Sequence, residues 1–443
     1  MLGDDAFTRR KDRFKRIRSV LQFLVIAVCL AMLADLFFHL KTYHPYDASS
    51  LADSSEDTGF IAISYFGVDR IGDSSTLIGK DLLEEHLQAL KDQGYVTITQ
   101  KDIEDYYQSG KPLPKRALYL MFEDGRRDTA IFADTIMERI NYKATMMTYA
   151  GVLDYEDPKF LKPKELRDME ESSFWEMGTN GYRLEYINVM DRYGNYIGEI
   201  NPLRYAMIHP YLDRHYNHYL MDYIRDKDGV PKESYNHMKR RVDYDYEHLR
   251  DVYEAQLGYV PHTYVLMHSN TGRFGNNRDI SPVNEKWIRD LFVMNFNREG
   301  YCFNQRGSSI YDLTRMQPQP YWPVNHLLMR IKYDINQPIS FKQGDDRHQQ
   351  DWDNLKGAAQ IKAEKYILTT LPEGEALSRL QSGEDFRDAR IRTRLEGNAF
   401  GAQKIYFRAA NDLSRYDEVS LRKGALVVPE KTGGTERDLY RDK

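Results

Sequence analysis

The apolar positions of the chain fall into one long block near the N-terminus and a series of short blocks after it. The long block, VLQFLVIAVCLAMLADLFFHL at residues 20–40, is interrupted only by Gln22, Asp35 and His39. It approaches the roughly 20 apolar residues that a helix needs to span a bilayer. We therefore predict a transmembrane anchor at 18–40, followed at 41–57 by a stalk that is rich in Ser and Asp and has no apolar period.

Short apolar blocks alternate with helical patterns from residue 58 onward. Such alternation is typical of a parallel sheet or barrel with helices on its outer side. The pattern predicts an α/β domain, a (β/α) barrel, over residues 58–335, with a polar, tyrosine-rich insertion at 190–250 that ends in a helix. The strand-like runs before this insertion lie at 59–69, 96–99, 117–122 and 143–150, and the helical patterns at 80–95, 102–110 and 129–140.

The character of the chain changes again near Phe341. Runs such as KIYFRAA and YDEVSLRKG alternate polar and apolar residues between glycine-bearing turns. A period of two residues favours antiparallel strands. We predict an all-β sandwich at 341–430 and expect the last 13 residues to form either a frayed tail or the start of a further segment.

The basic residues before the predicted anchor indicate its orientation in the membrane. Seven of the ten residues at 9–18 are basic, whereas the whole chain has a formal net charge of -5. Positive charge before a span places residues 1–17 in the cytoplasm and everything after about Lys41 outside it. A cleaved signal peptide is the rival interpretation, but cleavage after Ala34 would put Met32 where a small residue is preferred. The chain gives no sign of a basic surface for nucleic acid.

An acidic pair ends the strand-like run at 117–122. Glu123 and Asp124 follow this run directly, and Arg126 comes two residues later. Ligands of parallel α/β folds bind beyond the carboxyl ends of the strands, where ionised groups beside a core are costly unless they are used or compensated. We therefore take Glu123 and Asp124 as candidate catalytic residues. His268 ends a later apolar run and is a candidate acid.

Three segments of the predicted barrel carry a resemblance to a known family: LMFEDG at 120–125, WEMGTNGYRLE at 175–185 and YDLTRMQPQPYW at 311–322. They resemble segments of the polysaccharide deacetylases with a NodB homology domain, carbohydrate esterase family 4. In that family the first motif, TFDDG, supplies a general base and a metal-binding aspartate, and the second supplies two histidine ligands. The resemblance spans roughly residues 59–333 and implies a NodB-like barrel.

The resemblance implies roles for individual residues. Glu123 stands at the base position and Asp124 at the metal position, but Asn180 and Leu184 stand where the two histidines are expected. YVLMHSNTGRFG at 264–275 is similar either to the family's third motif or to its fifth, in which case His268 protonates the leaving group. Arg315 comes from the closing arginine-bearing segment. The residues expected to bind substrate are Trp175, Asn180, Arg126, Arg315 and Trp322.

The segment at 341–430 resembles the laminin G-like or concanavalin-like sandwiches of exported carbohydrate enzymes. By analogy this resemblance implies carbohydrate binding. A sandwich that packs without a ligand is the alternative.

Three classes of function remain open. The favoured hypothesis is metal-independent hydrolysis of an exported polysaccharide, which needs two carboxyl groups facing one bond. Because neighbours on a strand point to opposite faces, Glu123 or Asp124 is expected to pair with Glu176, while Trp175 and Trp322 stack on sugar rings. The alternatives are metal-dependent deacetylation and saccharide binding or assembly without catalysis.

The expected cofactor depends on which of these three functions the chain has. No cofactor is expected for hydrolysis or binding, and a zinc ion held by Asp124 is expected only for a deacetylase. His209, His215 and His218 of the insertion are a weak metal signal, because no carboxylate pattern accompanies them. The expected partners are a polysaccharide, the cell membrane and an exopolysaccharide synthesis or secretion complex.

Overall fold

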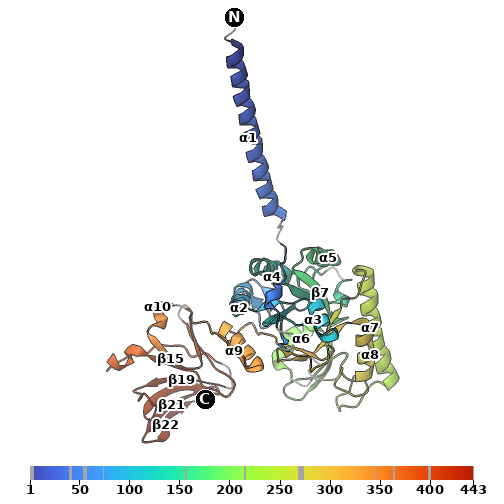
Figure 1. Cartoon of the computed structure of the whole chain (residues 1–443). Coiled ribbons are helices and arrows are strands. Elements are labelled where there is room, and N and C mark those ends of the chain that lie inside the picture. Colours follow the sequence, from blue (N-terminus) through green and yellow to red (C-terminus); the bar gives the residue numbers. More distant parts are fainter. Residues whose placement is uncertain are drawn as a thin grey trace. The chain divides into compact units, whose positions relative to one another are not determined.

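A computed structural model describes residues 4–38, 42–52, 57–72, 74–154, 157–213, 216–267, 274–344, 346–362, 365–397 and 401–442. The chain divides into two compact units, Met1–Arg379 and Leu380–Lys443 (Figure 1). The first unit contains the apolar N-terminal helix and the parallel sheet. The second contains an antiparallel sheet.

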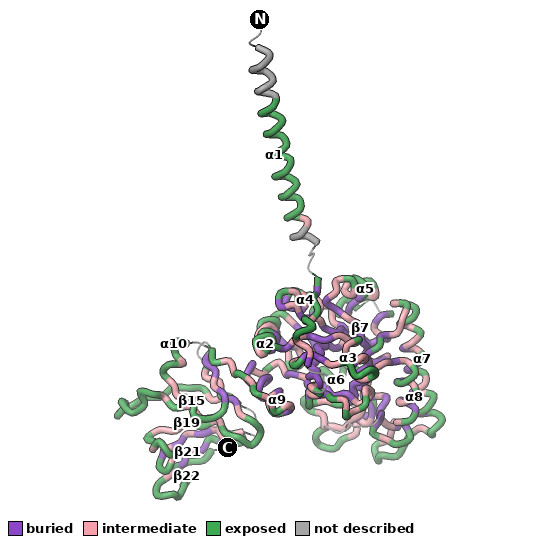
Figure 2. Tube along the Cα trace, in the orientation of Figure 1, coloured by how far each residue is buried: buried purple, intermediate pink, exposed green. Residues whose placement is uncertain are grey.

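Helix α1 (Asp4–Phe38) contains the long apolar block. Its side chains from Arg13 to Leu33 are exposed, including Phe23 at 75% (Figure 2). The stretch Arg13–Ala34 has a mean hydropathy of 2.3, and none of its most apolar part is buried within the protein. A helix that is apolar all round is stable only in a large core or in lipid. Its length and composition therefore agree with the predicted anchor.

Seven parallel strands form most of the main sheet. In spatial order they are β1 (Phe60–Tyr65), β5 (Ala117–Phe122), β6 (Ala144–Tyr149), β7 (Trp175–Gly181), β11 (Thr263–Val265), β12 (Met294–Glu299) and β14 (Leu313–Arg315). Just after β14, Met316 donates to Ala62 O and accepts from Ser64 N, at 3.0 and 2.9 Å. These bonds bring the last strand back to the first. The predicted (β/α) barrel is therefore confirmed as a nearly closed barrel.

Short strands extend this arrangement. β13 (Phe303–Asn304) runs antiparallel beside β1, and β4 (Val96–Thr97) runs parallel beside β5. β2 (Val68–Asp69) and β3 (Ile78–Gly79) form a small parallel pair of their own.

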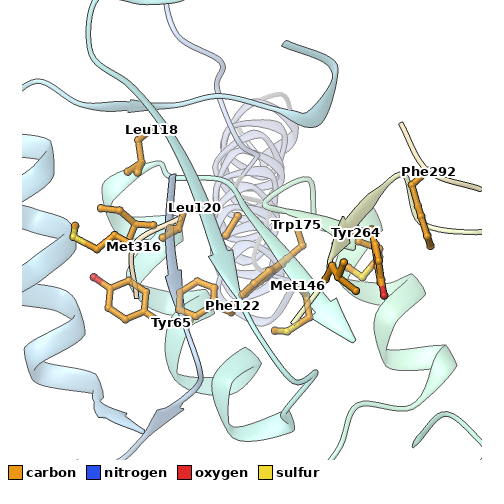
Figure 3. Close-up of a cluster of buried hydrophobic side chains, with 14 of the residues drawn as sticks. Tyr65, Leu118, Leu120, Phe122, Met146, Trp175, Tyr264, Phe292 and Met316 are labelled. Carbon is orange, nitrogen blue, oxygen red and sulfur yellow. The ribbon is translucent and has the colours of Figure 1, made fainter. Parts of the chain in front are cut away.

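The outer face of the barrel packs against helices. Every residue of β1, β5 and β6 is buried, as expected for parallel strands that are covered on both faces. Leu118, Leu120, Phe122 and Trp175 share one apolar core with the surrounding helices (Figure 3). These helices are α2 (Lys80–Asp92), α4 (Arg127–Ile140), α5 (Pro163–Glu171), α7 (Tyr235–Gln256), α8 (Ser281–Leu291) and α9 (Val324–Ile335).

The inner faces of the strands form a second core. Tyr119 of β5 stacks on Phe296 of β12 with ring centroids 5.6 Å apart. The Tyr119 hydroxyl lies 2.7 Å from Thr145 Oγ1 of β6 and 3.3 Å from Thr263 Oγ1 of β11. Helix α3 (Gln100–Gln108) adds Ile103 to this core. Side chains thus fill the barrel, and we look for a ligand site beyond the carboxyl ends of its strands.

A small antiparallel sheet begins just before the predicted insertion and continues into it. Its strands are β10 (Asn217–His218), β8 (Tyr186–Met190) and β9 (Tyr196–Ile200), in that order, with helix α6 (Pro202–Ile208) between β9 and β10. Tyr186, Val189 and Ile200 form its buried centre, against which Tyr205 and Tyr216 pack. The helix predicted at the end of the insertion is α7.

The all-β character predicted for residues 341–430 is confirmed. After the short helix α10 (Asp346–Gln349), β15 (Trp352–Lys356) pairs with β18 (Leu377–Leu380), and β16 (Ala358–Lys362) with β17 (Lys365–Thr369). The second unit is a meander of β19 (Ala402–Phe407), β20 (Tyr416–Arg422), β21 (Ala425–Thr432) and β22 (Thr435–Asp442).

The prediction of a frayed tail is wrong. Gly433 and Gly434 have φ angles of +60° and +84°, which suits a two-residue hairpin turn. Thr432 pairs with Thr435 across this turn, and the pairing continues to Leu426 and Asp442. The two glycines therefore return the chain as an edge strand.

Candidate functional site

The acidic pair lies in a tight turn at the carboxyl end of β5. Glu123 N donates to Tyr65 O of β1 at 2.8 Å, which extends the strand pairing by one residue. Asp124 and Gly125 then adopt φ angles of +69° and +62°, and α4 begins at Arg127. A Cβ atom at Gly125 would lie 2.8 Å from Thr148 Cγ2 of β6. This turn therefore needs a glycine and fixes where the two carboxyl groups point.

Glu123 is fully buried and belongs to a buried ion pair. Its Oε1 accepts from Arg315 Nε at 2.8 Å, from Gln317 Nε2 at 3.0 Å and from the Ser64 hydroxyl. Arg315 is also fully buried, and its Nη2 lies 3.5 Å from Glu299 Oε1 at the end of β12. The first, second and last strands of the barrel (β1, β5 and β14) thus meet at the Glu123 carboxylate, on the carboxyl side of the strands.

Asp124 lies beside this ion pair. Its main-chain N–H donates to Asn180 Oδ1 of β7 at 3.3 Å. Its Oδ1 is buried and has no hydrogen-bond partner among the described residues. Burial, and then the charge of Glu123, raise the pKa of Asp124 to about 7, against the opposing effect of Arg126 and Lys159. Asp124 can therefore accept or donate a hydrogen bond near neutral pH.

Two tyrosines line the same end of the barrel. The Tyr149 hydroxyl, at the end of β6, is buried without a hydrogen-bond partner in the described part of the chain. Burial, and then the charge of Asp124, raise the pKa of Tyr149 well above its ordinary value. Burial also raises the pKa of Tyr186, with smaller effects from Tyr205, Tyr216, Asp124 and Glu299. Asp124 thus acts electrostatically on both Tyr149 and Tyr186.

Sequence reasoning missed Tyr149, Tyr186 and Glu299. Tyr149 and Glu299 each end a strand of the barrel, the position from which Glu123 was chosen. The expectation that ligands bind beyond the carboxyl ends of the strands would therefore have selected Tyr149 and Glu299 as well. Tyr186 lies just before the predicted insertion, in the small antiparallel sheet, and nothing in its local sequence points to the barrel.

The structure brings together several of the predicted residues. Glu123, Asp124, Asn180 and Arg315 form one connected group, as described above. Arg126 directly precedes α4 beside this group, where it forms an ion pair with Asp128 at 3.6 Å and acts on the pKa of Asp124. His268 lies outside the described residues.

The predicted pairing of Glu123 or Asp124 with Glu176 is wrong. Glu176 is the second residue of β7, so it lies at the amino end of the barrel. Its Oε2 accepts from Gln100 N at 3.0 Å, at the start of α3. Burial raises the pKa of Glu176 to about 7, but neither Glu123 nor Asp124 acts on it. The length of β7 therefore separates Glu176 from Glu123 and Asp124, which lie at the carboxyl end of the barrel.

Trp175, one of the two predicted stacking tryptophans, is not in this group. Trp175 is buried on the outer face of the barrel, where its Nε1 donates to Asp134 of α4 at 2.9 Å and its ring contacts Phe122 (Figure 3). Trp322 is half-buried, and its ring centroid lies 4.4 Å from that of His326. An outward-facing tryptophan that packs under a helix cannot stack on a sugar beyond the strand ends.

The residues present do not fit the zinc ion that the family resemblance implies. Leu184 packs against the apolar centre of the small antiparallel sheet, and Asn180 Oδ1 already accepts from Asp124 N. Within the described ranges, no three His, Cys, Asp or Glu side chains are grouped to hold a metal. His209 is half-buried, His218 Nε2 lies 3.1 Å from Arg183 O, and His215 lies outside the described residues. A lone carboxylate binds zinc weakly compared with a full set of ligands.

We expect the purified full-length chain to contain well below one zinc ion per molecule by elemental analysis. EDTA should leave its thermal unfolding temperature unchanged, because the described side chains form no metal site that could stabilise the fold. Stoichiometric zinc whose removal lowers that temperature would contradict this prediction and would restore Asp124 as a ligand.

Comparisons with known proteins were made on sequence and on structure. No family model matches the chain. Two curated poly-β-1,6-N-acetyl-D-glucosamine N-deacetylases, from Escherichia coli K12 and O157:H7, are each 26% identical over 167 residues, which is 36% of this chain and 25% of the relative. The chain thus spans about a quarter of the length of the curated relatives it matches.

Solved structures of similar proteins were also found. A de-N-acetylase from Aggregatibacter actinomycetemcomitans matches at 18% identity and a TM-score of 0.46, over 60% of this chain and 98% of that one. The BpsB deacetylase domain from Bordetella bronchiseptica matches at 15% identity and a TM-score of 0.44, over the same shares. The relatives found by sequence confirm the predicted resemblance of this chain to the polysaccharide deacetylases.

Proposed function

We propose that this chain is an extracytoplasmic polysaccharide-handling protein that binds an N-acetylhexosamine polymer at the carboxyl end of its barrel, without a metal. The proposal rests on three buried polar atoms: Glu123 Oε2, Asp124 Oδ1 and the Tyr149 hydroxyl. Each lacks a hydrogen-bond partner among the described residues, and all three lie within electrostatic reach of one another. Buried polar groups are normally paired, so three unpaired ones in one place suit a polar ligand.

The chemistry of these atoms suits a sugar. Glu123 Oε2 can accept from a sugar hydroxyl, the Tyr149 hydroxyl can donate to a ring or acetamido oxygen, and Asp124 can do either near neutral pH. Tyr186, Tyr205 and Tyr216 add an aromatic wall with ring centroids 4.5 to 5.8 Å apart. The name of the curated relatives supplies the substrate class, poly-β-1,6-N-acetyl-D-glucosamine.

Tyr149→Phe tests this proposal. It removes a hydroxyl that has no described partner, so the unfolding temperature should stay the same or rise. If the hydroxyl contacts the ligand, binding of a β-1,6-linked N-acetylglucosamine oligosaccharide to the full chain should weaken about five- to ten-fold, since a hydrogen bond is worth roughly 1 kcal/mol. Isothermal titration calorimetry in detergent measures this change.

Tyr253→Phe is the matched control. Its hydroxyl lies 2.7 Å from Thr148 Oγ1 and 2.9 Å from Thr179 Oγ1 inside the fold. The control should therefore lose stability, by about 1 to 2 kcal/mol, and keep its affinity for the oligosaccharide. Equal affinities of Tyr149→Phe and the wild type would count against a glycan site at this end of the barrel.

Metal-independent hydrolysis is the second candidate, with Glu299 in place of Glu176. Arg315 contacts both Glu123 and Glu299, so two carboxylates flank one guanidinium at the carboxyl end of the barrel. Glycoside cleavage needs two carboxyl groups on either side of one bond. New reducing ends in the same incubation, absent with Glu299→Gln, would favour hydrolysis. Release of acetate would favour deacetylation.

We further propose that α1 anchors the chain with its N-terminus in the cytoplasm and the barrel outside. Protease added to spheroplasts of cells that carry the full chain should remove an epitope tag at the C-terminus and spare a tag at the N-terminus. Protection of the C-terminal tag would reverse the orientation.

A further inference from the structure

We propose a second saccharide-binding site, in the strands that follow the barrel. A cavity of about 310 Å³ lies in the first unit and is lined by side chains of α10, β15, β16 and β17 and of the segment before α10. Its side-chain walls are Phe341, Gln343, Gln349, Trp352, Asn354 and Tyr366. The volume is at the lower end of the range for small-molecule sites, which is about 300 to 1,000 Å³.

Two aromatic rings form one wall of this cavity. Trp352 of β15 and Tyr366 of β17 have ring centroids 4.7 Å apart and planes inclined by 42°. Both side chains are half-buried, so part of each ring remains available to a ligand. The face of an aromatic ring carries partial negative charge and attracts the C–H groups on the apolar face of a sugar ring.

Three side-chain amides supply hydrogen bonds. Asn354 is held in place because its Nδ2 donates to Gly357 O at 3.1 Å and its Oδ1 accepts from the Ser378 hydroxyl at 3.4 Å. It keeps one N–H for a ligand. The side-chain amides of Gln343 and Gln349 also line the cavity, and each offers both a donor and an acceptor, as sugar hydroxyls require.

Among the described residues, no charged side chain lines the cavity, so we assign it an uncharged ligand. Aromatic faces combined with neutral amides match a neutral oligosaccharide better than an acidic one, which would lack a cationic partner. The shape of the wall depends on Gly357, which has a φ angle of +72° and whose added Cβ atom would lie 2.6 Å from Ala376 Cβ. The turn between β15 and β16 is thus fixed by packing.

This site is distinct from the one in the barrel, since it shares no residue with it. A polymer that contacts both sites at once is bound more tightly than by either site alone, because the second contact is intramolecular. The choice of N-acetylglucosamine oligomers as one probe rests on the proposed function. The two sites are tested by different variants, so failure at one is distinguishable from failure at the other.

The test is titration of the full chain in detergent with a panel of oligosaccharides of N-acetylglucosamine, glucose, mannose and galacturonate. We expect at least one neutral member to bind and Trp352→Ala to weaken it about ten-fold. Gln349→Glu, which places a charge in the wall without removing an aromatic ring, should weaken it as well. The matched control is Leu355→Ala, on the same strand but outside the cavity lining and 47% exposed, which should bind like the wild type.

Circular dichroism must show that all variants are folded. Absence of binding by every neutral oligosaccharide would overturn the proposal. So would binding that Trp352→Ala and Gln349→Glu leave unchanged, including the case in which only Tyr149→Phe weakens it. Preference for galacturonate would contradict the assignment of an uncharged ligand.

Discussion

Arg315→Met should lower the free energy of unfolding by about 3 to 5 kcal/mol, because it leaves Glu123 buried without its counter-charge. Both side chains are fully buried, and the 2.8 Å bond between Arg315 Nε and Glu123 Oε1 joins residues 192 positions apart. Methionine fills a similar volume, so the loss reports the charge rather than a cavity. Guanidinium unfolding of the full chain in detergent, followed by circular dichroism, measures it.

Arg298→Met is the matched control for this prediction. Arg298 binds Asp312 through two bonds of 2.7 and 2.6 Å, but its side chain is 47% exposed. An exposed pair contributes less than about 1 kcal/mol. The double variant Arg315→Met with Glu123→Gln should recover at least half of the loss, because a neutral amide can still accept from Ser64 and Gln317. Equal losses for the two single arginine variants would refute the argument.

The sequence predicted where the acidic pair lies but not what it contacts. ALYLMF is a short apolar run that needs burial on both faces, so a parallel strand followed by a site at its carboxyl end could be inferred. The partners of Glu123 come from β1 and from the end of β14, and they depend on closure of the barrel. No local pattern encodes a contact between residues 192 positions apart.

The misplacement of Glu176 has a simple physical cause. The strand β7 begins at Trp175 and ends at Gly181, so Glu176 and Asn180 belong to the same strand but to opposite ends of it. The apolar and polar pattern of WEMGTNG predicts a strand without fixing where it begins. An error of a few residues in a boundary therefore moves a carboxyl group from one end of the barrel to the other, which is about 13 Å over four residues.

Asp124→Asn should raise the stability of the protein at pH 8 and leave it nearly unchanged near pH 4. The ordinary pKa of an aspartate is 3.8, and burial together with Glu123 raises that of Asp124 to about 7. Below pH 4 both the folded and the unfolded chain carry the proton. Between pH 4 and 7 only the folded chain keeps it, so stability falls as the pH rises and levels off above pH 7. An asparagine side chain does not ionise in this range, so the stability of the Asp124→Asn variant does not fall in this way.

The advantage of Asp124→Asn should therefore grow with pH to roughly 2 to 4 kcal/mol, since one pKa unit corresponds to about 1.4 kcal/mol. Chemical unfolding at a series of pH values measures it, and a constant difference between pH 4.5 and 8.5 would contradict the raised pKa. Glu176→Gln is the control at the other end of the barrel, because burial raises the pKa of Glu176 to about 7 as well. Both variants should gain stability at high pH, but only Asp124→Asn should change the affinity for the N-acetylglucosamine oligosaccharide. That difference would separate the carboxyl group at the proposed glycan site from one that is merely buried.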